Sequence, residues 1–140
     1  MKRDRLAALL TCYNRSSETI ASLAALFHQE YNREVTIDVY LVDDGSTDNT
    51  TTAVGQHYPQ VKIIPGTGNL FWNGGMRLAF AEAMQQDYDY YLWLNDDTLL
   101  YPNAWETLLA TSDSLQQQGE TRALIAGSTC DRQSQALTYG

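Results

Sequence analysis

Apolar and polar positions follow two different periods along the chain, and each period predicts a different kind of element. Leu6 to Tyr13 is a short, nearly continuous apolar run, as expected for a strand buried on both faces of a sheet. Residues 35–42 place valine, isoleucine, valine and leucine at every second position, which predicts a second strand. Three more short apolar runs predict strands over 61–65, 88–94 and 123–127.

Amphipathic stretches at helical spacing separate these runs. Helices are expected over four ranges: 16–31, 49–57, 75–86 and 102–118. Ser16 or Ser17 can cap the first helix, whose apolar stripe falls at Ile20, Leu23, Ala24, Phe27 and Tyr31. The repeated alternation of strand and helix predicts an α/β fold, with a mostly parallel sheet covered by helices on both faces.

A glycine-rich segment, Gly66 to Gly75, is expected to be a loop between the third strand and the following helix. Its glycines do not match the GxGxxG dinucleotide fingerprint directly after a strand. No internal repeat, low-complexity tract or interdomain linker interrupts the pattern. The 140 residues therefore fit one domain that is large enough to bury a core.

Charge narrows the possible partners. Seventeen acidic residues against nine basic ones give a net charge of −8, and no basic arm is present. A nucleic-acid duplex is therefore excluded as a partner. An anionic substrate such as a pyrophosphate would need a cation, or a few well-placed arginines, to bind here.

The cysteines and the N-terminal run favour a cytoplasmic domain. Cys12 and Cys130 are far apart and form no CxxC pair, so two free thiols in a reducing cytosol are expected. The apolar run that begins at Leu6 is too short to cross a membrane, and it leads into Tyr13 and Arg15 instead of a small-residue cleavage site. Peripheral association with the inner face of the membrane stays open.

Polar residues collect where three of the predicted strands end. They lie at Thr11 to Arg15, Asp43 to Asp48 and Asn95 to Asp97. The carboxyl ends of parallel strands meet at one edge of the sheet, and ligands of such sheets bind there. This coincidence of three clusters indicates a binding site more strongly than any one of them does.

Asp96 and Asp97 repel each other unless a cation or hydrogen-bond donors compensate them. A divalent ion that prefers oxygen ligands would compensate them and also bridge substrate phosphates. The alternative is that one acid caps the next helix while the other is solvated. The apolar strand before the pair favours the binding role, because it brings both carboxylates to the ligand edge.

Asp44 is a candidate acceptor for a nucleobase N–H, of the kind that uracil and thymine provide, and Gly45 permits a tight turn beside it. The alternative is ordinary helix capping, which Ser46, Thr47 or Asp48 can supply without Asp44. The acids in excess of what capping needs favour a site.

Other residues near these clusters have two interpretations each. Tyr13 can offer its ring to a base or simply pack. Arg15 and Arg77 can contact phosphate oxygens or stay solvated. Phe71 and Trp72, in the glycine-rich segment, can cover a ligand or fill a gap.

Four segments of the chain resemble the motifs of family-2 glycosyltransferases of the GT-A fold, particularly the rhamnosyltransferase-like members. They are TCYNR at Thr11 to Arg15, VDDGSTD at Val42 to Asp48, GNLFWNGGMR at Gly68 to Arg77 and LWLNDDT at Leu92 to Thr98. They occur in the family's order and spacing across nearly the whole chain. VDDGSTD followed about fifty residues later by an Asp-Asp strand end is a specific combination.

The resemblance implies roles on the nucleotide side of the site. Thr11 and Tyr13 would line the nucleobase pocket, and Asp44 would hold the base N–H. Arg77 resembles a basic residue that approaches the base or the phosphates.

It also implies a metal. Asp96 would lie near the ribose, and Asp97 would bind Mn²⁺ or Mg²⁺ on the diphosphate. Asn95 departs from the usual Asp-x-Asp form, which weakens the expectation of a metal without removing it.

The implied reaction is transfer of a sugar, with inversion, from a UDP- or dTDP-linked donor to a saccharide or lipid-linked acceptor. No credible catalytic base is found in the chain. Residues 1–140 are therefore expected to be the donor-binding part of a single GT-A domain, without its C-terminal acceptor-binding part and inactive alone.

Three other classes of protein compete with this interpretation. A non-catalytic nucleotide or nucleotide-sugar binding module with the same fold is the main alternative. A nucleotidyltransferase would carry a basic, glycine-rich loop after the first strand, where Thr11 to Asn14 stands instead. A receiver domain would place its acids after the first strand, and this chain does not.

Overall fold

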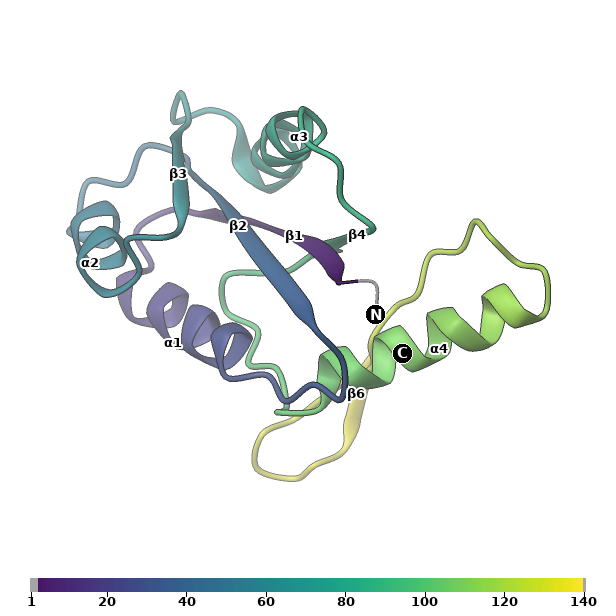
Figure 1. Ribbon diagram of the computed structural model, residues 1–140. Coiled ribbons are helices and arrows are strands. Elements are labelled where there is room, and N and C mark those ends of the chain that lie inside the picture. Colours follow the sequence, from purple (N-terminus) through teal and green to yellow (C-terminus); the bar gives the residue numbers. More distant parts are fainter. Residues whose placement is uncertain (1–2, 140) are drawn as a thin grey trace. The chain divides into compact units, whose positions relative to one another are not determined.

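The computed structural model describes residues 3–139 and groups them into two compact units (Figure 1). The first unit runs up to His28 and continues over Arg33–Leu100. The second unit contains Gln29–Asn32 and the residues from Tyr101 onward.

A parallel four-stranded sheet forms the centre of the first unit. Its strands are β1 (Asp4–Cys12), β2 (Val35–Asp43), β3 (Lys62–Pro65) and β4 (Tyr90–Trp93), in the spatial order β3-β2-β1-β4. β1 is central, and its residues from Leu6 to Cys12 are buried, as the continuous apolar run predicts. The predicted parallel sheet is confirmed.

Helices cover both faces of this sheet (Figure 1). α3 (Phe71–Ala83) packs on one face, while α1 (Ser16–Phe27) and α2 (Thr50–His57) pack together on the other side. The core under α3 consists of small and medium apolar side chains with one tyrosine: Ala7, Leu9, Tyr40, Val42, Met76, Ala79 and Ala83. The α/β class with helices on both faces is therefore confirmed.

The predicted apolar stripe of α1 is confirmed at Leu23, but Ile20, Ala24 and Phe27 are only partly buried. Its buried residues are Thr19, Ser22, Leu23 and Leu26, and the helix ends before Tyr31. The buried Ser22 hydroxyl donates to the Asn95 carbonyl at 3.3 Å, so a polar side chain on this side has a partner. The predicted serine cap is also wrong: the N-cap residue is Arg15, and no side chain caps the helix.

α3 begins at Phe71, four residues earlier than predicted. The two glycines interpreted as loop, Gly74 and Gly75, lie inside the helix. Gly75 is there because the helix packs against β1: a Cβ at this position would overlap the Thr11 side chain. The helix is held in place by tertiary contacts that its own glycine-rich sequence does not reveal.

The second unit contains α4 (Ala104–Gln117) and an antiparallel pair, β5 (Thr129–Cys130) and β6 (Leu137–Tyr139). The Gln29 side chain ties the segment Gln29–Asn32 to the rest of this unit. Its amide nitrogen donates to the Tyr101 carbonyl at 2.8 Å, and its oxygen accepts from the backbone N–H of Trp105 at 3.0 Å. The expected α4 is confirmed.

The predicted strand over 123–127 is wrong. No strand covers these residues, and Leu124 is fully exposed. Such a short run needs a neighbouring strand to satisfy its backbone, and the hairpin of this unit forms farther along the chain. Both cysteines are free thiols. None of the helices in the described residues combines the length and apolar character needed to cross a membrane.

Candidate functional site

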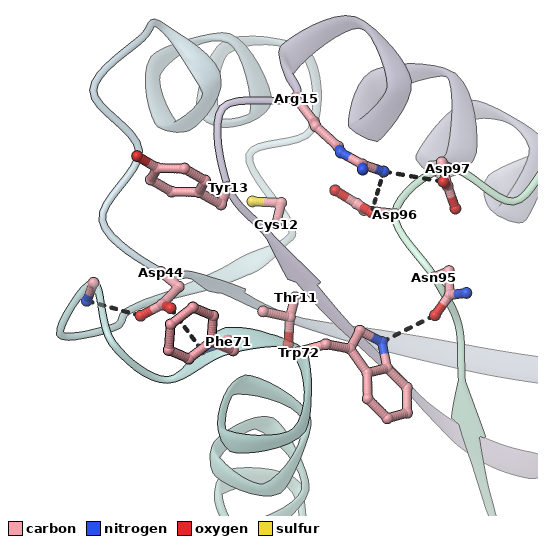
Figure 2. A pocket seen from close by; sticks show the side chains of 11 residues that line it. Thr11, Cys12, Tyr13, Arg15, Asp44, Phe71, Trp72, Asn95, Asp96 and Asp97 are labelled. Atoms are coloured by element: carbon pink, nitrogen blue, oxygen red, sulfur yellow. Dashed lines mark hydrogen bonds and ion pairs between the residues drawn. The ribbon is translucent and has the colours of Figure 1, made fainter.

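In the order β3-β2-β1-β4, the chain adds β2 and β3 on one side of β1 and then crosses over to add β4 on the other side. The order of the parallel strands therefore reverses between β1 and β4. Ligands of open α/β sheets bind outside the carboxyl ends of the strands at such a reversal. A cavity of about 630 Å³ lies there (Figure 2). It is lined from all three strand-end clusters and from the start of α3: Thr11, Cys12, Tyr13, Arg15, Asp44, Gly68, Phe71, Trp72, Asn95, Asp96 and Asp97.

Asn14 joins the loop after β1 to the loop after β2. Its backbone has a positive φ of 48°, a conformation that asparagine tolerates better than most residues. Its side-chain oxygen accepts from the Thr47 N–H at 2.7 Å and the Asp48 N–H at 3.2 Å, and its own N–H donates to the Ser46 hydroxyl at 2.9 Å. These bonds fix the backbone on which Tyr13 and Arg15 stand.

Asp43 and Asp48 serve the loop and the helix that follow β2. Asp43 accepts from the Ser46 N–H at 2.9 Å and from the Thr51 hydroxyl. Asp48 accepts from the Thr50 N–H at 2.9 Å, and its hydrogen bonds with Thr50 lower the pKa of the carboxyl. These two acids therefore hold the loop and the first residues of α2, although the N-cap residue of α2 is Asn49 and no side chain caps the helix.

Asp44 turns the other way, toward the start of α3. One carboxylate oxygen accepts from the Gly68 N–H at 2.8 Å, and the other accepts from the N–H groups of Leu70 at 3.0 Å and Phe71 at 2.9 Å. The residue is only 5% exposed. A carboxylate offers roughly four acceptor positions, so the three backbone bonds leave one for a ligand in the cavity.

Two glycines allow the close approach of the loops around Asp44. Gly45 has a φ of 81°, and a Cβ there would lie 3.0 Å from the Gly68 Cα. A side chain at Gly45 would press against the Gly68 backbone, whereas Gly68 has open space beside it and is favoured only by its own positive φ of 87°. The Gly in VDDGSTD is therefore required both by backbone conformation and by the neighbouring loop.

Thr11 presents an unusual polar atom. Its hydroxyl oxygen is buried at the cavity and has no hydrogen-bond partner among the described residues. Buried hydroxyls are rarely left without a partner, because the lost hydrogen bonds to water cost free energy. The Thr11 side chain packs against Gly75 of α3, where a Cβ would overlap the hydroxyl oxygen.

Asp96 and Asp97 are joined by one arginine (Figure 2). The Arg15 Nη1 lies 3.0 Å from an Asp97 carboxylate oxygen and 3.7 Å from an Asp96 oxygen. Asp96 is buried, while the side chains of Asp97 and Arg15 are each 50% exposed. Burial raises the pKa of the Asp96 carboxyl above its usual range, Arg15 opposes this shift, and Asp97 adds to it.

The Cys12 thiol is influenced by carboxylates from both acid pairs. Burial, with smaller contributions from the carboxylates of Asp43 and Asp96, raises the pKa of its thiol to about 12. The thiol is therefore neutral at physiological pH and is not a nucleophile. The sequence did not identify Cys12 as a residue that lines the cavity, because the pattern of an apolar strand does not show which of its last side chains faces a cavity.

The aromatic residues at the start of α3 lie at the cavity, as part of a helix and not of a loop. The Trp72 indole N–H donates to the Asn95 side-chain oxygen at 2.9 Å, and its ring meets Trp93 edge to face at a centroid distance of 6.2 Å. Phe71 has a φ of 56° and an exposed side chain. Asn95, which replaces the first acid of the expected motif, thus holds an indole ring.

The structure brings six of the seven predicted site residues to one cavity: Thr11, Tyr13, Arg15, Asp44, Asp96 and Asp97. Arg77 lies on α3, is exposed, and does not line the cavity.

A divalent metal fits this donor set only as part of a larger complex. Within residues 3–139, no group of three histidine, cysteine or acidic side chains is arranged to hold an ion. Mg²⁺ and Mn²⁺ are commonly bound by one or two carboxylates together with waters and substrate phosphates. Asp97, half exposed at the cavity and beside Asp96, suits that mode once Arg15 has moved away.

A cavity at the topological reversal, lined by strand-end acids and an arginine, is the arrangement of nucleotide-binding α/β proteins. The chain belongs to glycosyl transferase family 2, whose model matches residues 8–124. The family predicted from the four motifs is therefore confirmed.

Known relatives agree with this assignment. Hyaluronan synthase of Streptococcus pyogenes is 30% identical over an alignment that covers 96% of this chain and 32% of the synthase. The chain thus spans about a third of the length of that relative.

Solved structures share the fold. TarS of S. aureus superposes with a TM-score of 0.65 at 21% identity, over 80% of this chain and 20% of TarS. Its 1–349 portion has been solved with UDP and with UDP-GlcNAc. The mannosyltransferase PcManGT from Pyrobaculum calidifontis, in complex with GDP-Man and Mn²⁺, superposes with a TM-score of 0.64 at 20% identity, over 95% of this chain and 37% of PcManGT. The GT-A fold is confirmed.

Proposed function

We propose that the cavity binds the nucleoside diphosphate of an activated sugar, in a protein that transfers the sugar to a hydroxyl acceptor with inversion. The observation that carries the proposal is the convergence of three strand-end clusters on one cavity of about 630 Å³. This volume lies within the range typical of small-molecule sites, roughly 300–1,000 Å³. Solved relatives in complex with UDP, UDP-GlcNAc and GDP-Man support this ligand class.

The base side of the proposal rests on three residues. Tyr13 is 55% exposed and offers an aromatic face. Asp44 keeps one acceptor position after its three backbone bonds, which suits the ring N–H of uracil or thymine. Thr11 also lines the cavity, and its side chain packs against Gly75 of α3.

The phosphate side rests on Arg15, Asp96 and Asp97. We assign a phosphate oxygen to Arg15, since Arg77 does not line the cavity. Asp97, with Asp96 beside it, would hold Mn²⁺ or Mg²⁺, and Asp96 also lies where it can meet the ribose. A bound divalent metal supplies charge neutralisation for the leaving diphosphate.

Calorimetry on the 140-residue chain tests the proposal, with UDP, dTDP and GDP each titrated in the presence and absence of Mn²⁺. UDP and dTDP are expected to bind with micromolar to low millimolar dissociation constants, and more tightly with Mn²⁺. Asp97→Asn is expected to remove the effect of Mn²⁺. The matched control is Asp87→Asn, an exposed residue that does not line the cavity. Absence of heat with every nucleotide, from a chain whose circular dichroism shows it folded, would sink the proposal.

A non-catalytic nucleotide-binding module is the second candidate. One observation favours it: all three carboxylates that line the cavity are already engaged, Asp44 by backbone N–H groups and Asp96 and Asp97 by Arg15. None of the three is therefore placed as a base for an acceptor hydroxyl. Release of UDP from UDP-sugars, with and without saccharide or lipid-linked acceptors, distinguishes the candidates. Binding without turnover supports the module.

The acceptor class and the location belong to the same proposal. We take the acceptor to be a saccharide or a lipid-linked molecule, used on the cytoplasmic side, at the inner face of the membrane when lipid-linked. The two free thiols are consistent with a reducing compartment.

A further inference from the structure

Arg15 stands where a divalent cation would have to approach the acid pair. We propose that Arg15 competes with the metal for Asp97 and passes to the diphosphate when metal and nucleotide bind together, so that Arg15 makes metal binding depend on the nucleotide. This inference rests on the proposed function of the cavity. It assigns to Arg15 the role of linking the two binding events. Neither nucleotide binding nor metal binding requires such a link by itself.

The geometry makes the two cations alternatives. A single nitrogen, Nη1 of Arg15, lies 3.0 Å from Asp97 and 3.7 Å from Asp96. A metal ion bound to the same Asp97 oxygen would lie within a few Å of the guanidinium, as both positions are set by contact with one oxygen. Two positive charges at that distance repel each other strongly, so the metal displaces the arginine.

The contact is weak enough to exchange. Both side chains of the Arg15–Asp97 pair are 50% exposed. Ion pairs with this exposure change equilibrium constants by up to about fivefold. Such a contact excludes the metal only partially, and a second favourable interaction elsewhere is enough to release the arginine.

The backbone under Arg15 favours an anion as the next partner. Arg15 is the N-cap residue of α1, and no side chain caps this helix. The N-terminus of a helix has a partial positive charge, which repels a lone guanidinium and attracts anionic groups. The bonds of Asn14 to the loop after β2 hold this backbone fixed, so a side-chain rotation is sufficient for the exchange.

These facts predict positive coupling between metal and nucleotide. Metal alone must displace Arg15 without replacing its lost contact. When a diphosphate is present, the displaced guanidinium gains a phosphate oxygen instead. Each ligand therefore strengthens the binding of the other by the same factor.

The test measures Mn²⁺ binding to the 140-residue chain by the EPR signal of free Mn²⁺, with and without saturating UDP. Arg15→Gln is expected to bind Mn²⁺ about three- to fivefold more tightly than wild type without UDP, because the competitor is gone. The factor by which UDP strengthens Mn²⁺ binding is expected to fall by at least the same amount. Arg122→Gln makes the same change of charge at an exposed residue of the second unit, which does not line the cavity, and is expected to behave as wild type.

Two more variants separate competition from a general effect of charge. Asp97→Asn combined with Arg15→Gln is expected to lose the gain in Mn²⁺ affinity, because the contested carboxylate is gone. Arg15→Lys keeps the charge but not the planar guanidinium, and is expected to lie between wild type and Arg15→Gln. Circular dichroism confirms the fold of each variant.

Equal Mn²⁺ affinities of wild type and Arg15→Gln without nucleotide would overturn the inference, as would an unchanged coupling factor. These outcomes leave the proposed function intact if UDP still binds. If UDP fails to bind the wild-type chain at any Mn²⁺ concentration, the proposed function fails and this inference fails with it.

Discussion

The chain contains two Asp-Asp pairs at the ends of parallel strands, and the structure treats them in opposite ways. Asp43 and Asp44, after β2, are both buried and accept hydrogen bonds mainly from backbone N–H groups of neighbouring loops. Asp96 and Asp97, after β4, face one arginine side chain instead. The first pair is compensated by fixed dipoles, and the second by a charge on a flexible side chain.

This difference separates structural acids from exchangeable ones. Backbone donors cannot leave without unfolding the loop that presents them, so Asp44 keeps its partners when a ligand arrives. A guanidinium can leave by rotation about its own side-chain bonds. The same dipeptide is therefore held by backbone donors of neighbouring loops in one place and by an exchangeable arginine side chain in the other.

The largest effect on stability is expected at Asp44, and it tests the difference between the two acid pairs. Asp44→Ala removes the acceptor for three backbone N–H groups and is expected to lower the free energy of unfolding by about 3 kcal/mol. Asp97→Ala, at a half-exposed residue, is expected to change it by less than about 0.5 kcal/mol. Urea denaturation followed by circular dichroism measures both. Asp44→Asn keeps one acceptor oxygen and should lie between them; equal losses for the two alanine variants would contradict the contrast.

A smaller effect concerns Asp96, whose pKa burial raises. The folded protein then binds this proton more tightly than the unfolded chain does. The contribution of Asp96 to stability is present below the unfolded pKa and is lost as the pH rises through the folded pKa. Asp96→Asn is expected to raise the free energy of unfolding at pH 7 by about 0.5–2 kcal/mol and to flatten its decrease with rising pH.

Denaturation curves recorded from pH 4 to pH 8 check this prediction. Asp48 is a control for which the opposite pH dependence is expected, because hydrogen bonds with Thr50 lower its pKa. Its contribution is present above the unfolded pKa and is lost as the pH falls through the folded pKa. Asp48→Asn should therefore lose stability near pH 7 while Asp96→Asn gains it; a shift of both in the same direction would contradict the assignment.

The smallest effect is expected at Cys12, whose thiol pKa both pairs influence. Burial is the larger cause of its rise to about 12, and the carboxylates of Asp43 and Asp96 add to it. Asp96→Asn is therefore expected to speed alkylation of Cys12 by iodoacetamide at pH 8 by less than about tenfold, the effect of one pKa unit. Mass spectrometry of tryptic peptides follows Cys12, with Cys130 as the internal reference. A rate for wild-type Cys12 equal to that in urea would contradict its burial.

The sequence predicted well which strand ends meet at the cavity, because their position depends on a local property. An apolar strand that ends in polar residues marks its own carboxyl end, and parallel strands bring those ends to one edge. Thr11, Asp44 and Asp97 could thus be assigned to one site without knowing any contact between them. The order of the strands was not needed for this step.

The sequence failed where the deciding partner is distant. The start of α3 is set by Asp44, 26 and 27 residues before the N–H groups of Leu70 and Phe71, so local propensity placed the helix too late. Arg15 and Asp97 are 82 residues apart, and although their clusters were expected at one edge of the sheet, nothing in either neighbourhood shows that these two side chains pair. The run over 123–127 has the composition of a strand, but composition does not supply the neighbour that a strand requires.

The central place of β1 in the sheet has a consequence for the order of folding. β1 pairs with β2, about thirty residues later, and with β4, more than eighty residues later. Contacts that close short loops form before those that close long ones, because the entropic cost of closure grows with loop length. On the ribosome, β1, α1 and β2 can assemble well before β4 emerges. The acid pair after β4 therefore joins the cavity last, when the loops after β1 and β2 already stand in place.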